Sequence, residues 1–145
     1  TDQGSWCVEN EYLFGSSMLV APLFEDVTGR DVYLPEGTWI DYQTKKVYQG
    51  GWHKIEAGAL PIIVLVRNGS AIPHIKLAQS TKDMDWSKLT LKVYATDATT
   101  TATAKVFLPE GDKVQTITVS KKGNSFEVDA NPFNGKTTFK TELIK

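Results

Sequence analysis

The chain has 145 residues, sixteen of them basic and seventeen acidic, and 41% are hydrophobic. This length suffices for one good core or two small ones. The near-zero net charge argues against a nucleic-acid-binding protein. The longest apolar run, residues 60–66, is far shorter than the roughly 20 residues of a membrane-spanning helix, so we expect neither nucleic acid nor membrane as a partner.

Cysteine usage says little about the compartment. Cys7 is the only cysteine, so an intramolecular disulfide and a multi-cysteine metal site are both impossible. This slightly favours the cytoplasm and leaves the periplasm and the cell exterior open. The chain starts at Thr1 with no apolar signal region, which is typical of a fragment or a processed product.

Strand patterns dominate the first half of the chain. The expected strands are Met18–Leu23, Asp31–Leu34, Thr38–Tyr42, Lys46–Gln49, Trp52–Glu56, Leu60–Arg67 and Ser70–Pro73. Leu34-Pro35-Glu36-Gly37 predicts a tight turn, because proline fixes φ and glycine accepts a positive φ. Gly50-Gly51 and Asn68-Gly69 predict two further turns.

The second half returns to strands after a polar segment. Residues 76–87 predict a linker, with a short helical turn at 83–85. The strands expected after it are Leu89–Tyr94, Thr99–Leu108, Val114–Val119, Ser125–Val128 and Lys136–Ile144. Leu89, Leu91 and Val93 alternate and so share one face. Short strands separated by frequent turn signals predict an all-β fold, an antiparallel β-sandwich built as two small β units in tandem.

The polar residues offer no reaction centre. A glycosidase of the ordinary kind needs two carboxylates about 5–10 Å apart, and the acids of this chain fall mostly near turns and strand ends. His53 and His74 have no acidic or cysteine ligand at metal-binding spacing. We also find no nucleophile elbow and no phosphate-binding loop. The sequence therefore predicts no catalytic residue, no cofactor and no metal site.

The aromatic residues are the best remaining signal. Five large rings could form a flat platform that stacks on sugars: Trp39, Tyr42, Tyr48, Trp52 and Trp86. Of these, Trp39, Trp52 and Tyr42 are the candidate carbohydrate-binding residues. The alternative, which we favour, is that the rings pack inside a sandwich or against a neighbouring domain.

Four blocks of sequence follow one another between residues 9 and 75. They are Glu11–Gly15 (EYLFG), Ser17–Pro22 (SMLVAP), Val32–Tyr42 (VYLPEGTWIDY) with Gly50-Gly51, and Leu60-Pro61 followed by Val66–Pro73 (VRNGSAIP). In this order they resemble the C-terminal region of glycoside hydrolase family 31, the family of α-glucosidases and α-xylosidases. The Trp-x-Asp-Met-Asn-Glu type motif that carries the family's catalytic nucleophile is missing. Trp39-Ile40-Asp41 shares only Trp-x-Asp, so no catalytic role transfers to Asp41.

The resemblance implies a division of the chain and a role for it. Residues 1–15 would end the catalytic barrel or lead in from it, 16–80 would form the proximal C-terminal β-sandwich, and 83–145 a distal β domain, the last on position and β character only. The parent would be a retaining α-glycosidase, with its (β/α)8 barrel as the partner of this chain. The first hypothesis is thus a non-catalytic scaffold. The alternative is a carbohydrate-binding module for α-linked oligosaccharides; an independent enzyme is the third and least supported reading.

Overall fold

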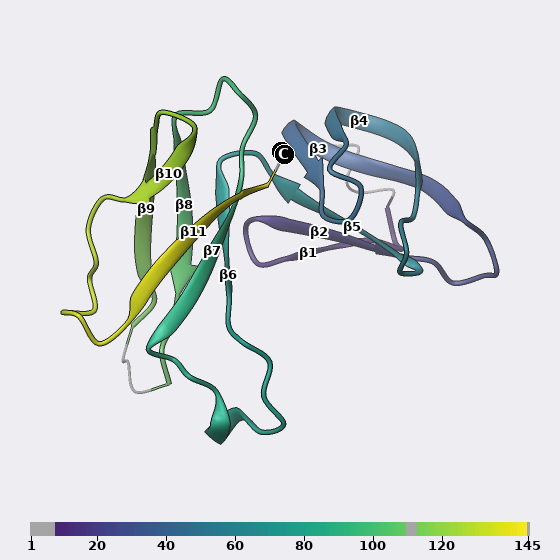
Figure 1. Cartoon of the computed structure of the whole chain (residues 1–145). Helices are drawn as coiled ribbons and strands as arrows, with labels where there is room; N and C mark the ends of the chain where they lie inside the picture. The colour runs from purple at the N-terminus through teal and green to yellow at the C-terminus, as the bar shows by residue number, and fades with distance from the viewer. Residues whose placement is uncertain (1–7, 110–112, 145) are drawn as a thin grey trace. The chain divides into compact units, whose positions relative to one another are not determined.

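The computed structural model describes residues 8–109 and 113–144 (Figure 1). The chain divides into two compact units, with the boundary between Asn68 and Gly69. This boundary lies ahead of residue 80, where the expected first domain ends. The reason is that strand β6 (Ser70–His74) pairs with strands of the second unit.

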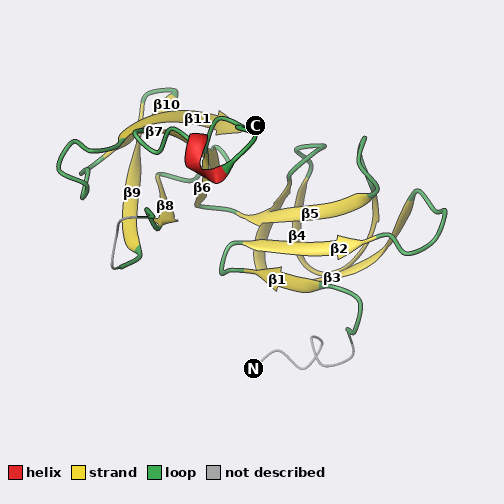
Figure 2. Cartoon of the chain, turned by 90° about the horizontal axis from the view of Figure 1, so that it is seen from below, coloured by secondary structure: helices red, strands yellow, loops and turns green. Residues whose placement is uncertain are grey.

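The first unit is a five-stranded antiparallel sheet with the order β1-β2-β5-β3-β4. Its strands are β1 (Tyr12–Phe14), β2 (Met18–Pro22), β3 (Gly29–Asp41), β4 (Val47–Glu56) and β5 (Ile62–Arg67). The sheet curls, as Figure 2 shows. The curl brings the start of β3 to the chain before β1, where Arg30 Nη1 donates to the carbonyl oxygen of Asn10 (2.8 Å). The same atom donates to the carbonyl oxygen of Pro22 (3.1 Å).

The curl encloses the core of the first unit. The buried cluster consists of Leu19, Ala21, Val32, Leu34, Trp39, Ile55, Ile63 and Leu65. In β2 three consecutive residues, 19–21, are buried, as the apolar run predicts for a strand covered on both faces. Each valine, leucine or isoleucine side chain of this cluster contributes about 1.5–3 kcal/mol when it is removed from water.

Two of the predicted turns are wrong. β3 continues through Leu34-Pro35-Glu36-Gly37, and β4 continues through Gly50-Gly51. Leu34 pairs with Gly51 and Thr38 pairs with Gln49, so the register shifts between these pairs. The extra residues form a bulge in β3, and bulges use the same proline and glycine chemistry as turns. The true turn follows β3, where the Asp41 carboxylate accepts from the backbone N–H of Gln43 (2.8 Å) and Thr44 (2.7 Å).

The second unit is a six-stranded sheet with the order β10-β9-β8-β6-β7-β11. Its remaining strands are β7 (Lys88–Tyr94), β8 (Thr101–Val106), β9 (Gln115–Lys122), β10 (Ser125–Val128) and β11 (Thr138–Ile144). β7 and β11 are parallel, as are β6 and β8, which departs from the wholly antiparallel expectation. The hydroxyl of Thr141 in β11 donates to the carbonyl oxygen of Phe126 in β10. The two edge strands therefore meet, and the sheet folds around its own core.

The core of the second unit follows the predicted alternation. Leu89, Leu91 and Val93 of β7 are buried together with Ala102, Ala104, Val106, Ile117, Val119 and Phe126. The all-β prediction is confirmed, and the described helical structure is one 3-10 turn, η2 (Thr81–Asp83). The Ser80 hydroxyl caps this turn by accepting from the N–H of Lys82 (3.2 Å). Within the described residues we find no helix with the length and apolarity to cross a bilayer.

Candidate functional site

Acidic side chains are the groups that could form a metal centre or a catalytic pair. Within residues 8–109 and 113–144, no three His, Cys, Asp or Glu side chains gather in a way that could hold a metal ion. Asp41 is a buried acid, only 2% exposed. Its carboxylate oxygen is occupied by the two backbone N–H groups of the turn after β3. Asp41 therefore has a structural explanation in this turn.

The predicted aromatic platform is not assembled. Trp39 is completely buried, its indole Nε1 donates to the carbonyl oxygen of Pro35 (2.8 Å), and the guanidinium of Arg67 lies 4.4 Å from its ring centroid. Tyr42 is half-buried, with Lys45 Nζ 5.4 Å from its ring centroid. Because Trp39 follows the bulge in β3, it faces the core, where no sugar could reach its ring.

Trp52 is the exposed member of the predicted set. Its side chain is 59% exposed, and it lies opposite Tyr33 across the β3–β4 pair. The two ring centroids are 5.3 Å apart with planes tilted by 56°. Tyr33 could not be predicted as a neighbour of Trp52, because the turn expected at 34–37 implies a different strand register.

A partly buried carboxylate lies next to Tyr33. Glu11 Oε2 accepts from the backbone N–H of Tyr33 (3.2 Å). Burial raises the pKa of Glu11 above its ordinary value of 4.5, although the Tyr33 hydrogen bond and the charge of Arg30 both act in the opposite direction. This carboxylate ties the segment before β1 to the middle of β3.

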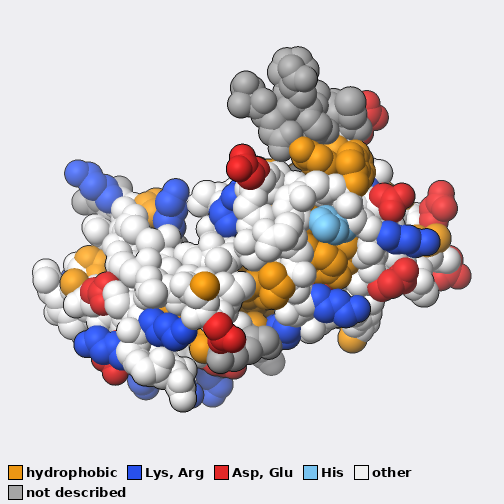
Figure 3. Space-filling view, turned by 90° about the horizontal axis from the view of Figure 1, so that it is seen from above, with side chains coloured by type: hydrophobic (Ala, Val, Ile, Leu, Met, Phe, Trp, Pro, Cys, Tyr) orange, Lys and Arg blue, Asp and Glu red, His pale blue; other side chains and the backbone are white. Residues whose placement is uncertain are grey.

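The most unusual surface of the first unit is β1. Tyr12, Leu13 and Phe14 are 54%, 52% and 65% exposed. Successive side chains of a strand point to opposite faces, so β1 is uncovered on both sides. It also forms the edge of the sheet. Exposed hydrophobic patches can be seen between charged groups in Figure 3, and contiguous exposed apolar surface is a common feature of interaction sites.

Comparison with known proteins identifies the first half of the chain. Residues 1–72 match the family model described as the Glycosyl hydrolase family 31 C-terminal domain. Residues 1–72 belong to this family. The match includes all five strands of the first unit, and it confirms the resemblance carried by the blocks between residues 9 and 75.

Individual relatives agree with the family. Alpha-glucosidase 2 of Bacillus thermoamyloliquefaciens is 35% identical over 86 residues, which is 58% of this chain and 11% of the relative. Alpha-xylosidase XylQ of Lactiplantibacillus pentosus is 39% identical over 84 residues, 52% of this chain and 11% of the relative. This chain thus spans about a tenth of these two proteins.

A solved structure extends the likeness into the second unit. A family 31 dextranase of Flavobacterium johnsoniae, determined with glucose, superposes with a TM-score of 0.70 at 26% identity. The superposition covers 88% of this chain and 17% of the dextranase chain. The fold of both units therefore recurs in a family 31 enzyme.

Proposed function

We propose that the chain is a non-catalytic C-terminal accessory region of a retaining α-glycosidase, where it acts as a scaffold for the catalytic (β/α)8 barrel of the same polypeptide. The parent enzyme would hydrolyse α-glucosides or α-xylosides, in keeping with the names of the relatives. Residues 1–15 would lead in from the barrel. The first compact unit would be the proximal sandwich and the second the distal β domain.

The exposure of β1 carries this proposal. Complete burial of a side chain of this size contributes about 1.5–3 kcal/mol. Because Leu13 and Phe14 are about half exposed, each loses about 1–2 kcal/mol of this stabilisation in the isolated chain. An edge strand with uncovered apolar faces is also prone to aggregate. Both costs are removed when another part of the parent chain covers the strand.

The experiment compares one double variant in two settings. Leu13→Thr with Phe14→Thr keeps the β-propensity of the edge strand and removes its apolar surface. In the parent enzyme we expect a loss of about 2–4 kcal/mol in unfolding free energy. In the 145-residue chain we expect a loss about half as large, roughly 1–2 kcal/mol, because only about half of the two side chains is removed from water there.

Leu77→Thr is the matched control. Leu77 is 90% exposed and lies outside the strands. A single exposed apolar side chain away from an edge strand is normal at a protein surface, so its replacement should leave both proteins unchanged. A parent enzyme that tolerates the β1 double variant as well as it tolerates Leu77→Thr would contradict the scaffold proposal.

The carbohydrate-binding alternative has less support in the form given by the sequence. Of its three candidates, Trp39 is buried, Tyr42 is half-buried, and only Trp52 presents most of its ring to solvent. Saturable binding of an α-glucan or a xylo-oligosaccharide that is lost in Trp52→Ala would favour this alternative.

A further inference from the structure

The second unit contains a pocket of about 650 Å³, a size typical of small-molecule sites. Its lining combines apolar and polar side chains, among them Trp86, Pro109, Phe133, Lys82, Asn134 and Lys136. The family match ends at residue 72, before any of these residues. The pocket is therefore a feature of the chain that the family assignment does not explain.

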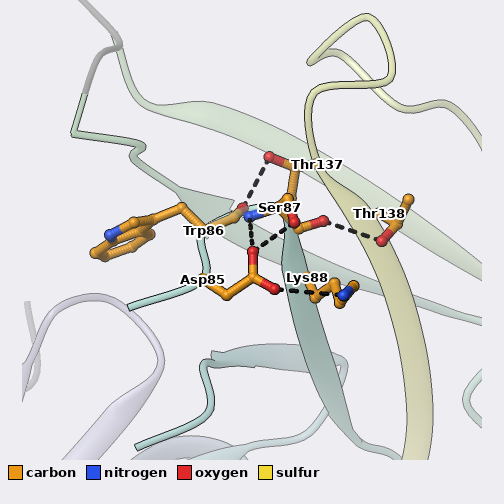
Figure 4. Close-up of polar contacts among 6 residues, drawn as sticks. All are labelled: Asp85, Trp86, Ser87, Lys88, Thr137 and Thr138. Atoms are coloured by element: carbon orange, nitrogen blue, oxygen red, sulfur yellow. Dashed lines mark hydrogen bonds and ion pairs between the residues drawn. The ribbon is translucent and has the colours of Figure 1, made fainter. Parts of the chain in front are cut away.

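The backbone that carries Trp86 is held firmly. The hydroxyl of Thr137, a residue only 1% exposed, donates to the carbonyl oxygen of Trp86 (3.1 Å). The next carbonyl, that of Ser87, accepts from the N–H (2.7 Å) and the hydroxyl (3.0 Å) of Thr138. Asp85 accepts from the N–H of Ser87 (3.1 Å). Figure 4 shows that the indole points away from this network, so the ring is fixed at its base, and Trp86 lines the pocket.

A second wall of the pocket is a braced loop. The Asn131 side chain donates to the carbonyl oxygen of Thr137 (2.6 Å) and accepts from the N–H of Phe133 (3.0 Å). The N–H of Lys136 donates to the carbonyl oxygen of Phe133 (2.9 Å). Asn134 has a φ of 49°, a left-handed conformation that asparagine tolerates. Both walls are therefore formed before any ligand arrives.

We propose that this pocket binds a neutral oligosaccharide, with one pyranose ring stacked on Trp86. This inference rests on the proposed function, because an α-glycosidase meets such molecules as substrates and products. The C–H face of a pyranose is flat and apolar and suits an indole beside Phe133 and Pro109. Its hydroxyls suit the amide of Asn134 and the ammonium groups of Lys82 and Lys136.

The test is a titration of the 145-residue chain with maltotriose and isomaltotriose, followed by NMR of the tryptophan indole N–H groups. Trp86→Phe assigns the Trp86 signal. We expect a saturable shift of that signal at millimolar sugar. Trp86→Ala lacks this signal, so its affinity is measured by isothermal titration calorimetry beside the unchanged chain. It should bind about tenfold more weakly, the effect of losing roughly 1.4 kcal/mol of stacking.

Asn134→Gly is the second variant. Glycine accepts the left-handed backbone, so this change removes the amide and preserves the loop. It should weaken binding several-fold, and Trp52→Ala should leave binding unchanged. Three results would overturn the proposal. They are the absence of any shift, a shift confined to the Trp52 signal, and full affinity in both Trp86→Ala and Asn134→Gly. None of these outcomes bears on the β1 double variant, which tests the scaffold separately.

Discussion

Gly50 explains how β3 and β4 stay paired through the bulge, and its replacement by alanine tests that explanation. A Cβ atom at Gly50 would lie 2.9 Å from Glu36 Cα, 3.1 Å from the carbonyl oxygen of Pro35 and 3.3 Å from Glu36 N. All three are backbone atoms, which cannot rotate away as the end of a flexible side chain can. Gly50→Ala must therefore displace the bulge of β3.

Two effects of opposite sign determine the size of the change. The backbone of Gly50 is not in the left-handed region, so alanine would normally stabilise this position by about 0.4–1 kcal/mol through the unfolded state. Overpacking against rigid atoms costs about 1–3 kcal/mol. We therefore expect a net loss of about 1–2 kcal/mol, which corresponds to a decrease of roughly 5–15 °C in Tm for a unit of this size.

The assay is urea and thermal unfolding of the 145-residue chain. Lys54→Ala is the control, since Lys54 is exposed on the same strand and its loss should change stability by less than about 0.5 kcal/mol. Unchanged or increased stability in Gly50→Ala would refute the close approach of the two strands.

Two further predictions concern ionisable groups. Because burial raises the pKa of Glu11, the folded chain holds this proton more tightly than the unfolded chain, and the stabilisation present below pH 4.5 is lost as pH rises through the folded pKa. The unfolding free energy of Glu11→Gln should therefore rise relative to that of the original chain as pH increases through the folded pKa. Urea titrations at several pH values measure this difference, and a difference independent of pH would contradict the prediction. Hydrogen bonds from Ser87, first from its hydroxyl and then from its N–H, hold the pKa of Asp85 below 3.8, with a smaller contribution from Lys88. Ser87→Ala should raise that pKa toward 3.8 in an NMR titration of the carboxyl group, whereas an unchanged pKa would mean that the hydroxyl does not contribute.

Local alternation predicted the second unit well. Residues 125–128 form a strand with the expected bounds, and Leu89, Leu91 and Val93 face the core as their spacing predicts. The sequence Leu108-Pro109-Glu110-Gly111 also predicts a turn, and its last two residues lie outside the described residues. Strand pairing was harder to predict from local patterns, because the parallel contact of β7 with β11 joins segments about fifty residues apart.

In the first unit, turn-forming residues alone do not predict where the strands end. Pro35, Gly37 and the Gly50-Gly51 pair suit a turn and a bulge equally well, and only the packing of long strands decides between them. The bulge in turn determines which face each later residue occupies. It places Trp39 in the core and brings Tyr33 beside Trp52, so the candidate site could not be predicted from residue type alone.

The pocket of the second unit could not be predicted from the sequence either, because its walls come from distant segments. Trp86 belongs to the aromatic set noticed in the sequence, but Phe133 and Asn134 come from a loop far along the chain. Thr137 brings the two segments together through its hydrogen bond to the Trp86 carbonyl oxygen. A lone threonine in a sequence carries no signal of such a contact.

Amide hydrogen exchange at β1 tests the scaffold account most directly. In the 145-residue chain, the amides of Leu13 and Phe14 lie on an edge strand with exposed side chains and should exchange rapidly. In the parent enzyme, the account predicts that exchange at both amides is slowed at least tenfold, because the barrel covers the strand. Equal exchange rates in the two proteins would contradict it.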